Sequence, residues 1–498
     1  MRYLPDGTQM KAADRHTIEE TGIPSLVLME RAALKTVETL QEYGMDLSKA
    51  LVVCGSGNNG GDGFAVARLL TEEGESAEVL FAGNESSMSG ECRIQKKIVE
   101  NMGIKVFTDL PAGEYTVIID AIFGVGLSRD ITGKYCDIIR WMNSQTCHKA
   151  AVDIPSGVCA RTGKILGTAF RADVTVSMAC VKLGCELYPG KMCSGQTAAV
   201  PIGIDTALFG ADENVCITYD REDIPRLMPE RRADSHKGSY GKVLMITGSR
   251  GMAGAACLSA RAAYAAGAGL VRIYTSEDNR TVLQQLLPEA VVTCYQKYDE
   301  AELLSLLEWA DIVCIGCGLG TGTVSEQILT CTLKYAEVPC IIDADGLNIL
   351  SSRMELFENR KAPSVLTPHM KEMSRLTGYP VSEIAGRRVE IITEAAGRYP
   401  AVWVLKDSRT LVKSTGRHTF LNLAGNPAMA KAGAGDVLAG VITGLLAQGM
   451  EAYDGAALGV FIHACGGDEA RGCKGDYSVL ARDIISGIER CITRTEEI

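Results

Sequence analysis

The chain lacks the features that would direct it to a membrane, to the cell exterior or to nucleic acid. Residues 1–16 contain no apolar signal core, and no apolar run approaches the ~20 residues that span a bilayer. The eighteen cysteines are scattered and show neither zinc-finger spacing nor a disulfide framework. A net charge of −11 argues against a nucleic-acid-binding surface. These absences predict a protein of the reducing cytoplasm with no membrane or nucleic-acid partner.

The length and the pattern of the chain predict two α/β domains. At 498 residues, 46% apolar and 22% charged, the chain is too long for one ordinary core. Residues 206–235 mix charge and proline, so we expect a boundary near 210–220 and assign residues 1–215 and 216–498 to the two domains. Both parts alternate strands and helices without an internal repeat.

The first domain is expected to open with helices over residues 9–45, interrupted at Gly22–Pro24. Leu26, Met29, Ala33 and Val37 recur at helical spacing, and we expect most of them to be core contacts. A buried strand over residues 50–54 then leads into a loop, residues 55–63, and a helix over residues 64–73.

That loop is unusually rich in glycine and polar side chains. Gly55, Gly57 and Gly60 fit the dinucleotide pattern G-x-G-x-x-G, but no acid is well placed about twenty residues later. Amides and a carboxylate within residues 58–62 indicate a loop that holds a phosphate and a cation. A plain turn between strand and helix is the alternative.

Two further strands of this domain end in acids. Residues 116–120 end in Asp120, and residues 150–153 end in Asp153, which is followed by Ser156. The carboxyl ends of neighbouring parallel strands would bring these groups and Asn59 to one crevice. Oxygen ligands of this kind suit a hard cation, either monovalent or Mg²⁺. Alternatively, each Asp caps the next helix.

Three segments resemble the N-terminal domain of the bifunctional NAD(P)H-hydrate repair enzymes, the YjeF family. They are residues 57–63 (GNNGGDG), 120–127 (D-x-x-x-G-V-G-L) and 152–157 (VDIPSG). Residues 22–25 and 28–31 resemble it as well, and the likeness covers roughly residues 5–205. It implies a Rossmann-like three-layer αβα sandwich that epimerises hydrates of NADH and NADPH. It also implies K⁺ bound by Asn59, Asp120 and Ser156.

The resemblance further implies a set of substrate contacts. Asp153 would contact the reduced ring, and we assign it as the acid/base catalyst. Lys182 occupies a position where the family often has lysine followed by proline, but Leu183 follows here, so its role stays open. The residues expected to hold the hydrate are Asn58, Asn59, Gly60, Gly61, Asp62, Gly124, Val125, Gly126, Leu127, Ser128, Arg129, Asp130 and Asp153.

In the second domain, polar groups again follow predicted strands. Asp343 and Asp345 follow one strand, His369 follows the next, and residues 406–410 follow another. Open α/β sheets bind ligands at this edge. Taken singly, the acids could be caps, the histidine a turn residue and Lys406 a surface charge.

Residues 433–436 (GAGD) lead directly into an apolar helical segment. Small residues let a ligand approach the backbone, and a helix N-terminus favours phosphate. Asp436 is placed to take a proton from a hydroxyl that attacks this phosphate. The alternative is that Asp436 only caps the helix.

This motif matches the anion hole of the ribokinase-like superfamily. Together with residues 236–238 (HKG), 343–348 (DADGLN) and 366–369 (LTPH), it resembles the second domain of the same repair enzymes over roughly residues 225–495. That domain is a ribokinase-like αβα fold that dehydrates the S-hydrate with ADP or ATP and Mg²⁺, and bacterial members use ADP. Departures from the family are Cys317 for proline, Ala434 for threonine and Asp407 for glycine.

The resemblance assigns the contacts of the second site. Ala255, Gly318, His369 and Asp436 would contact the hydrate. The nucleotide would contact Lys406, Asp407, Ser408, Arg409, Thr410 and Gly435. We expect Asp436 to act as the catalytic base, ADP to yield AMP and phosphate, and the chain to form a homo-oligomer. A small-molecule kinase fused to a ligand-sensing domain and a non-catalytic binding protein are the alternatives, although the presence of Asp120, Asp153 and Asp436 disfavours the latter.

Overall fold

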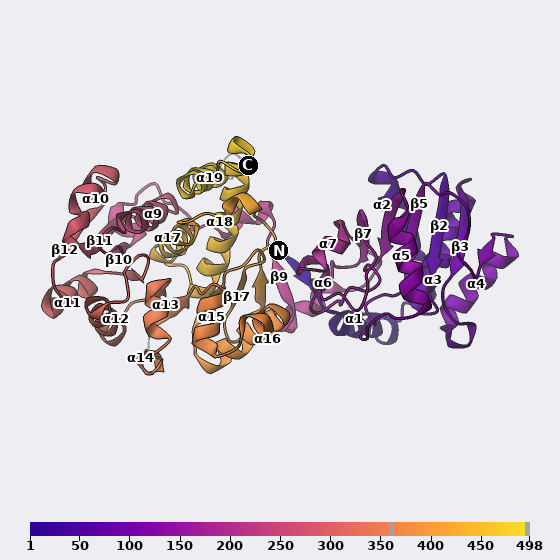
Figure 1. Ribbon diagram of the computed structural model, residues 1–498, viewed down its shortest axis with the longest axis horizontal. Coiled ribbons are helices and arrows are strands. Elements are labelled where there is room, and N and C mark those ends of the chain that lie inside the picture. The colour runs from indigo at the N-terminus through magenta and orange to yellow at the C-terminus, as the bar shows by residue number, and fades with distance from the viewer. Residues whose placement is uncertain (359, 361, 494–498) are drawn as a thin grey trace. The chain divides into compact units, whose positions relative to one another are not determined.

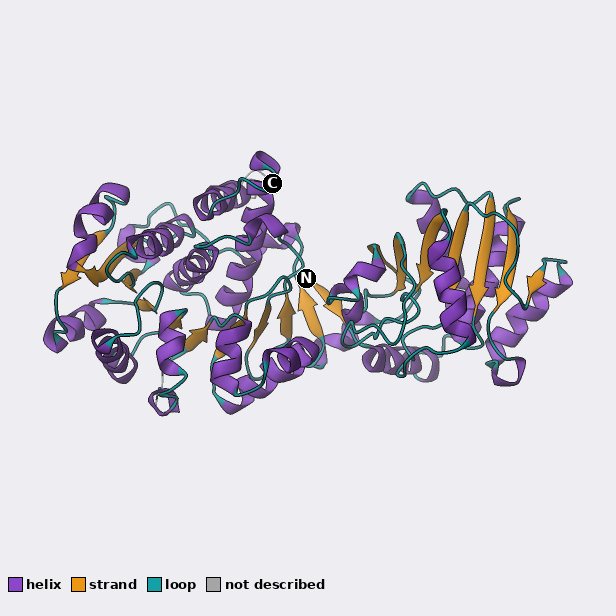
Figure 2. Cartoon of the chain, in the orientation of Figure 1, coloured by secondary structure: helices purple, strands orange, loops and turns teal. Residues whose placement is uncertain are grey.

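The computed structural model describes residues 1–358, 360 and 362–493, and the chain folds as two compact α/β units. One unit comprises Arg2–Cys216, and the other comprises Ile217–Ile498 together with Met1. Helices and strands alternate in both (Figures 1 and 2). Among the described residues, every helix is too short or too polar to traverse a lipid bilayer.

The first unit is built on a seven-stranded parallel sheet in the order β4-β3-β2-β5-β6-β7-β8. The strands, with the short N-terminal β1, are β1 (Arg2–Leu4), β2 (Lys49–Cys54), β3 (Ser76–Phe81), β4 (Val106–Phe107), β5 (Val117–Ala121), β6 (His148–Val152), β7 (Val174–Met178) and β8 (Gln196–Val200). The helices are α1 (Gly7–Glu19), α2 (Ser25–Glu42), α3 (Asn58–Glu72), α4 (Gly90–Asn101), α5 (Lys134–Ser144), α6 (Leu183–Glu186) and α7 (Lys191–Ser194).

Alternate residues of β2 bury opposite faces of this sheet. Val52 packs in a core cluster with Val37 of α2 and Phe64 of α3, and Val53 packs with residues of α5. Helices therefore cover both faces, which confirms the predicted αβα sandwich. Met29, Ala33 and Val37 are buried as expected, whereas Leu26 is exposed.

Helix α3 begins at Asn58, six residues earlier than expected, so the polar residues 58–62 form its first turns and are not a loop. The glycines make this possible by letting the helix pack directly on the strand end. A Cβ on Gly60 would lie 2.0 Å from the Gly55 carbonyl oxygen. The amides and the carboxylate are thus held on a rigid helix N-terminus.

In the second unit, strands follow the order β18-β17-β16-β15-β14-β13-β10-β11-β12, and only the β16–β17 and β17–β18 pairs are antiparallel. The strands are β10 (Lys242–Ile246), β11 (Leu270–Ser276), β12 (Val291–Tyr295), β13 (Ile312–Ile315), β14 (Cys340–Ile342), β15 (Ser364–Leu366), β16 (Val402–Leu405), β17 (Leu411–Lys413) and β18 (Thr419–Leu421). A further strand, β9, covers Cys216–Thr218.

Two groups of helices accompany this sheet (Figure 1). In one group α9, α17, α18 and α19 contact one another, and the other group runs from α11 to α16. The helices are α8 (Ile224–Leu227), α9 (Ala253–Ala265), α10 (Arg280–Leu286), α11 (Glu300–Trp309), α12 (Thr323–Tyr335), α13 (Asp345–Leu350), α14 (Glu355–Glu358), α15 (Met370–Thr377), α16 (Val381–Arg398), α17 (Ala434–Ala447), α18 (Ala452–Lys474) and α19 (Ala481–Thr493).

The small residues of α9 and α17 serve close helix packing. A Cβ on Gly440 would lie 2.1 Å from the Ser259 carbonyl oxygen, and one on Gly444 would lie 2.4 Å from that of Ala263. This contact fixes α17 along α9, and the first turn of α17 carries Asp436.

Candidate functional site

The first unit contains a cavity of about 720 Å³ around the carboxyl ends of β2, β5 and β6. Most of the predicted substrate contacts line it: Asn58, Asn59, Asp62, Gly124, Val125, Gly126, Leu127, Ser128, Arg129 and Asp153. Gly60, Gly61 and Asp130 do not line it. Gly60 and Gly61 instead provide the close packing beneath the first turn of α3.

The three residues predicted to bind K⁺ surround the segment that follows β5. Asp120 is buried and accepts hydrogen bonds from the Ser156 hydroxyl (2.7 Å), the Ser156 amide (2.7 Å) and the Ile122 amide (3.1 Å). The Ser156 hydroxyl also accepts from the Phe123 amide at 2.9 Å. Burial raises the pKa of Asp120 to about 6, and the hydrogen bonds limit that rise.

Asn59 lies against the same segment. Its side chain lies near Gly124, and its amide nitrogen is buried without a hydrogen-bond partner within the described part of the chain. The local set is therefore rich in oxygen and carries one carboxylate. This composition fits a monovalent cation, and the unpartnered amide can donate to a bound ligand.

Asp153 follows β6 and holds a left-handed backbone conformation with φ of 70°. The Ser177 hydroxyl donates to its carbonyl at 2.6 Å, and the Met178 amide donates to its carboxylate at 3.2 Å. A non-glycine residue persists in this region only when its surroundings enforce it. The carboxylate is thus held in one position at the cavity wall.

Lys182 is the partner of Asp153. Its buried ammonium group donates to the Asp153 carboxylate, and it donates to the Met178 carbonyl at 2.7 Å. Both residues line the cavity. The sequence left the role of Lys182 open. In the structure its ammonium group contacts the carboxylate of Asp153, the expected acid/base catalyst.

Two more carboxyl groups line the same cavity. Burial and then Asp153 raise the pKa of Asp14 to about 6, and burial followed by Asp153 and Asp14 raises that of Asp62 well above its usual value. The cavity therefore holds two carboxyl groups with raised pKa values beside an ammonium group. Sequence reasoning missed Asp14, although it lies on one helical face with Met10, Lys11 and Ile18.

In the second unit, Asp343 and Lys406 form a buried ion pair. Lys406 Nζ lies 2.5 Å from Asp343 Oδ1, which also accepts from the Thr367 hydroxyl at 2.7 Å. Burial disfavours the charged form of Lys406. The negative charges of Asp343 and Glu372 have the larger effect, so the pKa of Lys406 is raised. Asp343 is therefore not a helix cap and Lys406 is not a surface charge, although the sequence alone allowed both interpretations.

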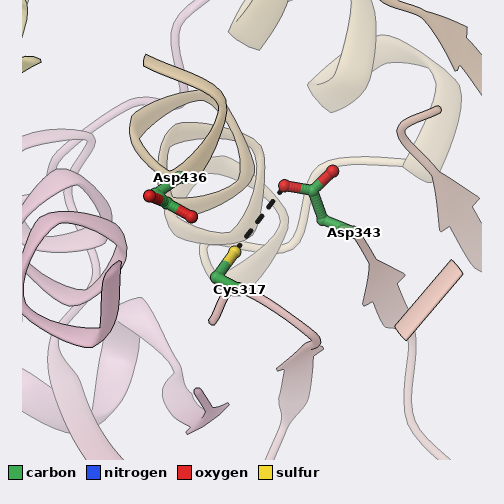
Figure 3. Close-up of side chains that lie close together, drawn as sticks. All are labelled: Cys317, Asp343 and Asp436. Atoms are coloured by element: carbon green, nitrogen blue, oxygen red, sulfur yellow. Dashed lines mark hydrogen bonds between the residues drawn. The ribbon is translucent and has the colours of Figure 1, made fainter. Parts of the chain in front are cut away.

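Asp436 lies in the first turn of α17, whose N-cap is Gly433 with φ of 90°, so Asp436 is not the N-cap. Burial and then the charge of Asp343 raise the pKa of Asp436 to about 6. The Cys317 thiol lies between the two carboxylates and donates to Asp343 Oδ2 at 3.7 Å (Figure 3). A carboxyl group with this pKa can exchange protons near neutrality.

Other predicted residues of this site also lie close together. A Cβ on Gly318 would lie 2.8 Å from the Ala255 Cβ, and one on Gly435 would lie 3.6 Å from Lys406 Nζ. A ligand could therefore approach the backbone closely beside the Asp343–Lys406 ion pair. Gly318 of the predicted hydrate set thus lies beside Ala255, and Gly435 of the predicted nucleotide set lies beside Lys406.

The remaining predicted residues are occupied by local contacts. His369 caps α15, and its ring accepts from the Lys371 and Glu372 amides at 3.1 Å. The Asp407 carboxylate pairs with Arg388 at 3.0 Å, and the Arg409 guanidinium donates to the Leu423 carbonyl at 3.1 Å. Ser408 is exposed, Thr410 is buried, and the Thr410 hydroxyl donates to the Asp407 carbonyl at 2.9 Å.

His463 on α18 is a residue near this site that the sequence did not identify. Its Nε2 is buried and has no hydrogen-bond partner among the described residues, and its ring contacts the Ala434 backbone. Burial lowers its pKa to about 4, so it is neutral near pH 7. The feature of the sequence that could have identified His463 is a single histidine within an apolar helical segment.

Comparison with known proteins accounts for both units. Residues 25–184 match the model of the YjeF-related protein N-terminus, and residues 243–490 match that of NAD(P)H-hydrate dehydratase. The bifunctional NAD(P)H-hydrate repair enzyme of Moorella thermoacetica is 34% identical, with 99% of this chain and 97% of that protein covered. That of Thermofilum pendens is 36% identical, covering 95% and 93% respectively. The chain belongs to the family of bifunctional NAD(P)H-hydrate repair enzymes.

Solved structures support the family assignment for the second unit. The ADP/ATP-dependent NAD(P)H-hydrate dehydratase from Bacillus subtilis, co-crystallised with ATP and Mg²⁺, is 31% identical with a TM-score of 0.50. The match covers 56% of this chain and 99% of that one. A ribokinase-like protein from Enterococcus faecalis is 30% identical with the same TM-score and covers 56% and 95%. This repair enzyme therefore has a ribokinase-like second unit, as the GAGD motif indicated.

Proposed function

We propose that this chain repairs hydrated NADH and NADPH with two successive activities. The first unit interconverts the R and S hydrates, and the second converts the S form to NAD(P)H while ADP becomes AMP and phosphate. The observation that carries the proposal is the presence, on one chain, of the Asp153–Lys182 pair in a cavity and of Asp436 at the start of α17. The full-length relatives support combining the two activities.

In the first unit, Asp153 is the acid/base group at the carbon whose configuration changes. Lys182 orients this carboxylate, and Asp14 and Asp62 keep further exchangeable protons at the cavity wall. The polar first turn of α3 and residues 124–129 hold the dinucleotide. Positioning of this kind places the reacting carbon within reach of Asp153.

Asn59, Asp120 and Ser156 would hold K⁺ beside the same loop. The bound cation would offset the charge of the buried Asp120 carboxylate and of the dinucleotide phosphates. The chain's own contribution is the oxygen-rich set around residues 122–124, supported by the hydrogen bonds of Ser156.

In the second unit, Asp436 takes the proton of the ring hydroxyl, whose oxygen then forms a bond to the terminal phosphorus of ADP as the bond to AMP breaks. The phosphate ester then leaves the ring carbon as inorganic phosphate, and loss of a ring proton restores the dihydronicotinamide double bond. The backbone amides of Gly435 and Asp436, in the first turn of α17, and the Lys406 ammonium would stabilise the negative charge of the transferring group. Mg²⁺ bound with the nucleotide would supply further positive charge, as the nucleotide-bound Bacillus subtilis structure suggests.

The cellular location of the protein, its assembly and its choice of nucleotide stay predictions. All eighteen cysteines are free, which supports a reducing cytoplasm. Assembly into a homo-oligomer is to be measured by light scattering. The choice of ADP over ATP is to be measured by comparing kcat/KM for the two nucleotides.

The decisive experiment follows the recovery of dihydronicotinamide absorbance from a mixture of R- and S-NADH hydrate with ADP and Mg²⁺. Wild type should convert the whole mixture, Asp153→Asn should convert only the S portion promptly, and Asp436→Asn should convert neither. AMP and phosphate should appear in equal amounts with NADH. Accumulation of a phosphorylated product would instead support a small-molecule kinase.

A further inference from the structure

In the second unit, a thiol and two carboxylates converge at a point to which the proposed reaction assigns no metal ion. Cys317 follows β13, Asp343 follows β14, and Asp436 lies in the first turn of α17. One potential ligand atom of each lies within 4.8 Å of the other two, and Figure 3 shows the side chains pointing toward one another. Three separate elements therefore present one ligand each to a common point.

The two oxygens of Asp343 face different partners. Oδ1 accepts from Lys406 and Thr367, whereas Oδ2 faces the Cys317 thiol at 3.7 Å. Oδ2 and the sulfur can therefore share a ligand without breaking the Asp343–Lys406 ion pair. Donors around a tetrahedral Zn²⁺ are roughly 3.3–3.8 Å apart at ordinary Zn–O and Zn–S distances, so small side-chain rotations suffice.

The charge and the chemistry of the cluster select the kind of cation. Two carboxylates and a thiolate carry three negative charges, and the nearby Lys406 ammonium is also close to Glu372, so the cluster keeps a net negative charge that a divalent cation would reduce. Cys317 and Asp343 are almost fully buried, so an unbalanced charge there is costly. A thiolate ligand favours Zn²⁺ over Mg²⁺ and Ca²⁺, which prefer oxygen.

We propose that Cys317, Asp343 and Asp436 form a binding site for a thiophilic divalent cation of the Zn²⁺ class, and that its occupation stops dehydration. On binding, the Cys317 sulfur exchanges its proton for the metal, and the proton passes to solvent. The bound Asp436 carboxylate can no longer accept the proton of the hydrate hydroxyl. The inhibitory consequence rests on the proposed function, whereas the binding site does not.

The binding experiment uses the full chain and ZnCl₂ alone, titrated calorimetrically in a buffer that does not bind metal. Cys317→Ala should weaken binding of one Zn²⁺ per chain at least 100-fold. Cys473→Ala, which removes an exposed cysteine on α18, should leave it unchanged. Equal affinity and stoichiometry in wild type and Cys317→Ala would overturn the proposal.

Cobalt provides a spectroscopic readout of the sulfur ligand. Co²⁺ added to wild type should give a thiolate-to-metal charge-transfer absorption that is absent in Cys317→Ala and retained in Cys473→Ala. Cys317→Ser, which keeps the size of the side chain, serves as a second variant, and circular dichroism verifies that each variant is folded. Retention of the absorption in both folded Cys317 variants would place the metal elsewhere and refute the site.

The activity experiment separates this inference from the proposed function. Stoichiometric Zn²⁺ should abolish dehydration by wild type, leave epimerisation unchanged, and leave the rate of Cys317→Ala, whatever its value, unaffected. Zinc bound at Cys317 with dehydration continuing would overturn the inhibitory role. A chain that never dehydrates the hydrate would refute the proposed function, while the two binding experiments would still decide the site.

Discussion

At the scale of single residues, burial gives ordinary side chains unusual proton affinities. The pKa values of Asp14, Asp120 and Asp436 rise to about 6, and each rise has burial as its largest cause. Such values suit groups that exchange protons near neutrality. Asp436 also lies near the negative charge of Asp343, which disfavours its ionised form and contributes to the rise in its pKa.

The pH dependence of dehydration should reveal Asp436 as a base. Only the ionised carboxylate accepts a proton, so kcat/KM should be level above about pH 7, reach half of this level near the pKa of about 6, and approach a tenfold fall per pH unit below it. Initial rates with S-hydrate and ADP provide the measurement, and ADP affinity is followed over the same range to separate the ionisation of the nucleotide. A level profile down to pH 5 would contradict the assignment.

Lys182 should be required for epimerisation because it holds the Asp153 carboxylate in place. We expect Lys182→Met to slow epimerisation about 100-fold or more. The measurement is the rate at which the R hydrate becomes available to the dehydratase. Lys164→Met, which changes an exposed lysine of the same unit, is the control. Activity close to wild type in Lys182→Met would leave the lysine a purely structural role.

At the scale of secondary structure, close backbone packing decides where the active-site helices begin. Residues 58–62 read as a loop because asparagine and glycine are poor helix formers, yet they form the start of α3. The missing side chain of Gly60 lets this turn lie against Gly55. Gly440 and Gly444 play the same part between α17 and α9.

Replacing Gly60 with alanine should therefore destabilise the first unit. Its Cβ would lie 2.0 Å from a backbone oxygen that cannot move independently, so we expect a loss of about 2–3 kcal/mol in the free energy of unfolding. Gly57→Ala is the matched control, because a Cβ there meets no atom within 4 Å; its loss should stay below about 1 kcal/mol. Thermal unfolding of both variants tests the difference, and similar losses would refute the packing argument.

At the scale of the whole molecule, the chain contains two units, and the proposed function assigns one site to each. In that proposal the first activity supplies the epimer that the second consumes. We expect the intermediate to pass between the sites by free diffusion.

Mixing two single-site variants tests this expectation. Asp153→Asn retains the dehydratase site and Asp436→Asn retains the epimerase site, so an equimolar mixture should convert R-hydrate at a rate similar to wild type at equal site concentration. Recovery of NADH absorbance from R-hydrate provides the measurement, and each variant alone is the control. A mixture several-fold slower than wild type would indicate direct transfer within one chain.

The sequence by itself determined the α/β class, the division into two parts and the strand ends that carry acids. These follow from periodic burial and from glycine-rich turns, which are local properties of the chain. It also indicated Asp153 and Asp436 through their motifs, although their catalytic roles stay predictions.

Only the tertiary structure decided which of these groups meet and what surrounds them. Four findings depend on segments that are far apart in the chain. They are the pairing of Asp153 with Lys182, the presence of Asp14 in the cavity, the exposure of Leu26 and the position of the Cys317 thiol between two carboxylates. Burial and the charge of distant neighbours set proton and metal affinity, and neither is encoded in a residue's local sequence.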